Sequence, residues 1–111
     1  MGEVMALTRD FKETVLARAE QDPTFAQALF DEAISLFLNG EVVTAKLILR
    51  DLVNATIGFE GLAICVEKPT KSVHRMLSTG GNPTMSNLSA IFAALKSALK
   101  IEIQMHSVSI A

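Results

Sequence analysis

Apolar residues recur every three or four positions through most of the chain, and this spacing predicts a series of amphipathic helices. The first predicted helix begins near Thr8, whose hydroxyl can cap it, and its apolar side carries Phe11, Val15 and Ala19. The pattern changes to strict alternation only after residue 100. The expected fold class is therefore all-α, with one short strand at its C-terminal end.

The second and third predicted helices have clear boundaries. Asp22 and Pro23 suit the cap and the first turn of the second helix, and Asn39 with Gly40 suits its end. Its inward stripe is predicted to comprise Phe25, Ala28, Leu29, Ala33, Leu36 and Phe37. The third helix is expected from about Glu41 to Thr56, with its apolar stripe at Val42, Ala45, Ile48, Leu49, Leu52 and Val53.

Two short helices and one long helix follow. An apolar segment over residues 59–66 is separated from a second one over 70–77 by Pro69, which cannot continue a helix. After a Gly-rich loop over residues 79–83, Thr84 can cap the long helix. The predicted buried positions of this helix are Leu88, Ile91, Phe92, Leu95 and Leu99.

The last segment, residues 100–108, reads as a half-buried strand. Ile101, Ile103 and Met105 alternate with polar residues there. No other segment alternates as clearly, so the same strand of a second copy is one candidate partner. The whole chain, residues 1–111, is interpreted as one domain, with a helical hairpin over 1–39, a core over 41–99 and the strand.

Composition narrows the class of protein. With 111 residues, half of them hydrophobic, the chain suits one folded domain. Its single cysteine, Cys65, has no partner for an internal disulfide, and residues 1–4 lack the features of a signal peptide. No apolar stretch approaches the roughly 18 residues that a membrane-spanning helix needs. These features predict a cytoplasmic protein that does not insert into membranes.

The charges are distributed unevenly along the chain. Residues 1–67 carry eleven acidic and five basic side chains, whereas residues 68–101 carry five basic side chains and no acidic one. Such asymmetry favours a region that meets a polyanion, although a solvated basic face would give the same count.

The sequence offers little for catalysis. Two histidines and one cysteine lack the spacing of a metal site, and the motifs of nucleophilic or phosphate-binding enzymes are missing. Cys65 is expected to be a buried, inert thiol. The chain is therefore predicted not to be an enzyme, with no catalytic residue, cofactor or metal.

The segment from Phe59 to Leu77 has the spacing of a helix-turn-helix. Small Ala63 and apolar Val73, ten positions apart, can pack where the two short helices meet. The residues left to project are polar or basic, and each can donate to base edges or phosphates: Thr70, Lys71, Ser72, His74 and Arg75. The alternative is an ordinary helical hairpin whose polar face is simply exposed to solvent.

The sequence also resembles the XRE-type helix-turn-helix regulators, and among them the antitoxins of addiction modules that are partners of RelE/ParE-like toxins. The resemblance rests on Asp22-Pro23 with Phe25-Ala26, residues 49–53, Gly58-Phe59 with Leu62-Ala63, residues 72–78, and Gly81 to Thr84 with Asn87-Leu88. It implies a lambda-repressor-like helical bundle over 41–99, preceded by two extra helices, and a homodimer on double-stranded operator DNA.

Carried over to this sequence, the resemblance implies DNA contacts by Lys68, Thr70, Lys71, Ser72, His74, Arg75, Asn82 and Thr84, with Asn82 and Thr84 beside a phosphate. Glu67 departs from the family, since glycine commonly occupies this turn, and we expect it to need a left-handed backbone. The first hypothesis is thus a repressor of its own operon that neutralises a toxin through its acidic half. The second is a protein-interaction module without DNA binding.

Overall fold

The computed structural model describes residues 15–111, and every regular element in this range is a helix. Residues 15–21 are helical. They are followed by α2 (Pro23–Leu38), α3 (Val42–Ala55), α4 (Gly58–Val66), α5 (Thr70–Met76) and α6 (Met85–Leu99). The all-α prediction is confirmed for the described residues, whereas Thr8 and Phe11 of the first predicted helix lie outside them.

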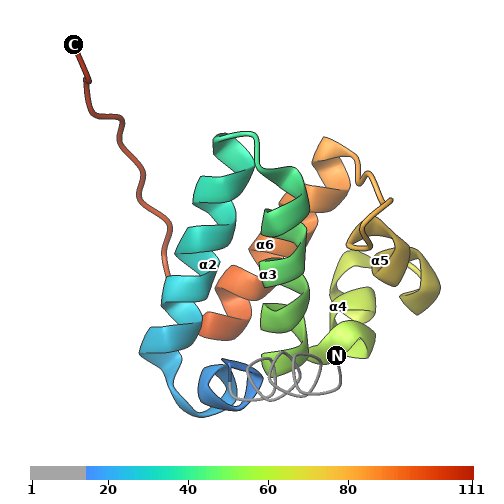
Figure 1. Ribbon diagram of the computed structural model, residues 1–111. Coiled ribbons are helices and arrows are strands. Elements are labelled where there is room, and N and C mark those ends of the chain that lie inside the picture. The colour runs from blue at the N-terminus through green and yellow to red at the C-terminus, as the bar shows by residue number, and fades with distance from the viewer. Residues whose placement is uncertain (1–14) are drawn as a thin grey trace, which may run out of the picture.

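The helices form two groups that share one core. Helices α2 and α3 are antiparallel neighbours, and α6 lies against them, as Figure 1 shows. Helix α4 contacts both α3 and α6, and α5 packs mainly against α4. The α4–α5 pair therefore lies at one side of the molecule, away from α2. None of the described helices is long and apolar enough to cross a membrane.

Local signals in the sequence set the two ends of α2. The carboxylate of Asp22 accepts hydrogen bonds from the backbone N–H groups of Thr24 and Phe25, at 3.0 and 3.3 Å. At the other end Gly40 adopts a positive φ of 86°, and the N–H of Glu41 donates to the carbonyl of Leu36 at 2.8 Å. This left-handed cap satisfies carbonyls that the helix leaves free. The predicted boundaries of α2 are confirmed.

The core joins residues from the five helices α2 to α6. Phe92 of α6 meets the rings of Phe30 and Phe37 of α2 edge-on, with centroid distances of 5.6 Å in both pairs. The fully buried large side chains are Phe30, Leu49, Leu52, Leu62, Leu77, Ile91, Leu95, Val53 and Val73. Most predicted inward positions of α3 to α6 are thus confirmed, although Val42 is 41% exposed.

Besides Val42, two further predicted burial assignments are wrong. The buried residues of α2 are Ala26, Phe30 and Ala33, whereas the predicted Ala28 is exposed. Apolar residues cover more than one side of this helix, so their spacing alone did not identify the inward one. Cys65 is also exposed rather than buried, because α4 turns Leu62 and Ala63 toward the core instead.

The predicted strand over residues 100–108 does not form within the described chain. Lys100 caps α6, and residues 101–111 have no regular secondary structure. Only Ile101 at the start of this segment is half-buried, and it packs against the core. The physical reason is that a strand needs an extended neighbour, and every other described element is a helix.

Candidate nucleic-acid interface

The turn between α4 and α5 is formed by Glu67, Lys68 and Pro69. Glu67 is left-handed, with φ 55° and ψ 46°, as expected from the resemblance to motifs that carry glycine at this position. Its N–H donates to the carbonyl of Ile64 at 3.3 Å, and the N–H of Lys68 donates to that of Ala63 at 3.1 Å. This pair of bonds is a Schellman cap, which closes α4 and redirects the chain at once.

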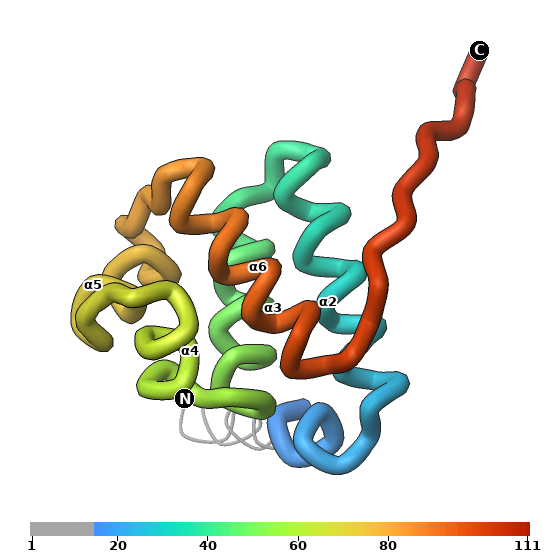
Figure 2. Tube along the Cα trace, turned by 180° about the vertical axis from the view of Figure 1, so that it is seen from behind, coloured from blue at the N-terminus to red at the C-terminus, as the bar shows by residue number. Residues whose placement is uncertain are grey.

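Helix α5 is held in place along one side only. Val73 and Leu77 are fully buried and belong to the same core cluster as Leu62 and Ala63 of α4. Since α5 packs mainly against α4, much of the opposite side of α5 is left exposed, and Figure 2 shows α5 beside α4 at the edge of the molecule.

Four of the eight predicted DNA-contacting residues are exposed on or beside α5. Lys71 and Arg75 are exposed and four positions apart, so they share one side of α5. Lys68 and His74 are exposed as well, whereas Thr70 and Ser72 are half-buried. The only ion pair within residues 15–111 joins Arg18 to Asp22, so none neutralises Lys68, Lys71 or Arg75 there.

His74 has a contact within the protein that its sequence position does not predict. The imidazole stacks on the ring of Phe59 in α4, with centroids 3.9 Å apart and planes inclined by 17°. This contact fixes the ring on the α4 side of α5. His74 therefore contributes to the packing of α4 against α5.

The last two predicted residues, Asn82 and Thr84, lie where the loop from α5 enters α6. The hydroxyl of Thr84 accepts a hydrogen bond from the backbone N–H of Asn87 at 3.1 Å, which confirms its capping role. Asn82 is exposed in the preceding loop. The amides of Met85 and Ser86 lie in the first turn, where helical N–H groups lack an intrahelical acceptor and can bind an anion.

Lys46 of α3 also shapes the candidate interface, although it is not among the residues predicted from the sequence. It is 3% exposed, and its ammonium donates to the carbonyls of Thr79 at 3.1 Å and Gly81 at 2.6 Å. The loop between α5 and α6 is thereby tied to the body of the protein. A signal existed, because Lys46 shares the helical spacing of buried Leu49 and Val53.

The same loop is packed tightly against the end of α5. A side chain at Gly81 would collide with the carbonyl oxygen of Arg75 and with the backbone of Met76. Gly80, its neighbour, has open space around it. Gly81 is thus required by close packing, whereas Gly80 is not.

The acid-free part of the sequence does not form a single basic patch. Lys68, Lys71 and Arg75 lie on or beside α5, but Lys96 and Lys100 lie at the C-terminal end of α6. With a rise of 1.5 Å per residue, the two ends of α6 are about 22 Å apart. The candidate interface therefore contains three of the five basic side chains.

The described residues present no other chemical site of comparable definition. Within 15–111, no three His, Cys, Asp or Glu side chains are grouped so that they could hold a metal ion. Comparison of the chain with protein families, with curated proteins and with solved structures finds no match.

Proposed function

We propose that this protein is a sequence-specific DNA-binding transcriptional regulator in which α4 and α5 act as a helix-turn-helix. The observation that carries the proposal is the open side of α5, where Lys71 and Arg75 are exposed and unpaired among the described residues. A short helix held along one side by its neighbour is suited to entering the major groove.

The residues around α5 divide into two roles in this proposal. Lys71 and Arg75 read base edges, since both side chains can donate to the acceptors of guanine. Lys68, Asn82 and the amides that open α6 hold phosphates and set the orientation of α5. Thr70 and Ser72, which are half-buried, lie at the end of α5 that would enter the groove first.

The biological setting is inferred from the resemblance to XRE-type antitoxins and from charge. We propose a cytoplasmic homodimer that represses its own toxin-antitoxin operon and neutralises a RelE/ParE-like toxin. Asp31 and Glu32 of α2 are exposed, and Figure 1 shows α2 on the side of the molecule away from α5. An acidic surface there would attract a basic toxin without covering the DNA-binding side.

Fluorescence anisotropy with the DNA upstream of the gene, against a shuffled duplex, tests the proposal. We expect preferential binding that weakens with salt, and its loss in the Lys71→Ala/Arg75→Ala variant. Each phosphate contact contributes about −0.9 to the slope of log affinity against log salt concentration. Removing a residue that contacts phosphate should therefore make this slope less steep. The matched control, Lys96→Ala/Lys100→Ala, removes the same charge far from α5 and should bind almost as wild type.

A protein-interaction module is the second candidate, and one observation favours it. Ile64 on α4 is 79% exposed, close to the carboxylates of Glu60 and Glu67, and neither feature helps phosphate binding. This module predicts equal or absent binding to both duplexes, and a partner captured by a surface that includes Ile64. The anisotropy experiment therefore separates the two functions directly.

A further inference from the structure

The segment that follows α6 is extended and its backbone is unpaired. Residues 102–110 make no backbone–backbone hydrogen bond with any described residue. Figures 1 and 2 show this segment running beside α2 and continuing beyond it. A row of free N–H and C=O groups in an extended path is a template for pairing with another strand.

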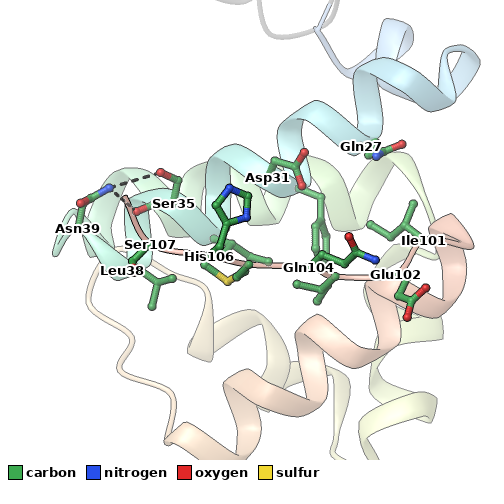
Figure 3. A pocket seen from close by; sticks show the side chains of 14 residues that line it. Gln27, Asp31, Ser35, Leu38, Asn39, Ile101, Glu102, Gln104, His106 and Ser107 are labelled. Carbon is green, nitrogen blue, oxygen red and sulfur yellow. Dashed lines mark hydrogen bonds between the residues drawn. The ribbon is translucent and has the colours of Figure 1, made fainter. Parts of the chain in front are cut away.

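The first part of the segment is nevertheless positioned by the rest of the protein. Ile101 packs against the core, and residues 101–107 line a groove of about 690 Å³ together with residues of α2. In Figure 3 the chain runs from Ile101, near Gln27, to Ser107, near Leu38 and Asn39. Because α2 lies along one side of the segment, the path of the segment is fixed and its opposite side is left free to pair.

The side chains of this segment have the pattern of a strand without a partner. Ile103 is 40% exposed and Met105 is 62% exposed, and they alternate with Glu102, Gln104 and His106. Exposed apolar groups on an unpaired extended backbone are the features that strand addition uses for affinity and register.

We propose that residues 101–107 pair antiparallel with the same residues of a second copy. A two-fold axis perpendicular to such a ribbon places one residue opposite itself. With Gln104 at that position, Ile103 faces Met105 of the second copy, and Glu102 faces His106. Apolar pairs across an antiparallel pair are favourable, and the carboxylate of Glu102 can accept a hydrogen bond from an imidazole N–H of His106.

The register centred on Met105 is less favourable. If Met105 were opposite itself, Ile103 would face Ser107 and Gln104 would face His106. One Met105–Met105 pair would then replace the two Ile103–Met105 pairs, and Glu102 would no longer face His106. An isolated two-stranded ribbon is only marginally stable in water. Here each strand would have its own α2 beside it, so the ribbon has a support on both outer sides.

The pairing deepens the proposed homodimer but does not depend on DNA binding. The segment and α2 lie on one side of the molecule and α5 lies on the other, as Figure 1 shows. Two copies joined in this way would leave both α5 helices uncovered. A failure of DNA binding would therefore leave this proposal intact, and the two can be tested separately.

The first test is the molar mass of the full chain by light scattering and sedimentation equilibrium. We expect a dimer for the wild type and a dissociation constant raised about tenfold or more in Ile103→Asp/Met105→Asp, since carboxylates would replace the apolar pairs. The matched control is Val108→Asp, which alters an exposed residue outside the paired register and should remain a dimer. Circular dichroism checks that each variant keeps its helices.

The second test examines the register by disulfide trapping in a Cys65→Ser background. Gln104→Cys should form a cross-linked homodimer, because residues directly opposite each other are close enough for a disulfide. Glu102→Cys and His106→Cys should cross-link to each other when mixed, and much less when each is alone. A wild type that stays monomeric, a dimer unaffected by Ile103→Asp/Met105→Asp, or a dimer without the 104–104 cross-link would each overturn the proposal.

Discussion

The side-chain nitrogen of Lys46 lies 2.6 Å from the carbonyl oxygen of Gly81 and ties α3 to the loop between α5 and α6. A second bond, to the carbonyl of Thr79 at 3.1 Å, holds the same ammonium. A charged group with so little exposure is stabilised by the dipoles it meets. The orientation of the loop that leads to Asn82 and Thr84 is therefore set by a residue more than thirty positions earlier.

Replacing Lys46 by methionine should remove this tie while keeping a long apolar stem. Hydrogen bonds to charged groups contribute roughly 1.5–3 kcal/mol. We therefore expect the substitution to lower the free energy of unfolding by an amount in this range. Urea unfolding followed by circular dichroism measures it. Lys96→Met is the matched control, because Lys96 is exposed on α6, and it should change stability by less than about 0.5 kcal/mol. Equal effects of the two substitutions would contradict a structural role for Lys46.

The two neighbouring glycines of this loop should respond in opposite ways to alanine. Gly81→Ala places a methyl group against the backbone of Arg75 and Met76, so the end of α5 must shift, and we expect destabilisation of about 2 kcal/mol or more. Gly80→Ala meets nothing and should be neutral, or stabilising by about 0.4–1 kcal/mol, because it restricts the unfolded chain. Thermal unfolding of both variants checks this contrast, and a tolerated Gly81→Ala would show that the loop packs differently.

The sequence predicted the features that depend on a few adjacent residues. Asp22 and Thr84 were identified as caps because a capping side chain bonds backbone groups two or three positions away. The left-handed conformation of Glu67 was expected from the resemblance to XRE-type regulators, in which glycine commonly occupies this turn position. The exposure of Lys71 and Arg75 followed from their position opposite the apolar side of α5.

Features that depend on distant contacts were missed. The buried state of Lys46 is decided by loop carbonyls 33 and 35 positions away, and the stacking of His74 by Phe59 on the preceding helix. The predicted C-terminal strand was wrong for the single chain because alternation specifies an extended segment but not its partner. The basic residues of the acid-free stretch are divided between α5 and the C-terminal end of α6, because residues close in sequence need not form one surface.

The stack of His74 on Phe59 leads to a prediction that separates packing from recognition. His74→Ala removes an aromatic contact, and such pairs are worth about 0.5–1.5 kcal/mol beyond their buried area. We expect a loss of stability of at least that size in chemical unfolding. His74→Phe keeps a planar ring over Phe59 and should recover most of it.

The same two variants report on DNA binding. If the polar edge of His74 reads a base, His74→Phe will be stable yet bind the upstream duplex more weakly, by about 1–3 kcal/mol. If the residue only packs, His74→Phe will bind as wild type. Unchanged stability in His74→Ala would contradict the packing role.

Glu67 provides the last prediction, because its backbone strain and its charge can be altered separately. A non-glycine residue in the left-handed region costs roughly 1–2 kcal/mol, so Glu67→Gly should raise the free energy of unfolding by about 1 kcal/mol. Glu67→Gln keeps the strain and removes only the carboxylate next to Lys68, so it should leave stability almost unchanged and tighten DNA binding at low salt.

Lys100 ends α6 with the same geometry, at φ 56°, about 22 Å from the start of that helix. Lys100→Gly should therefore stabilise the protein as Glu67→Gly does, without the gain in DNA affinity, and a destabilised Glu67→Gly would exclude the left-handed turn.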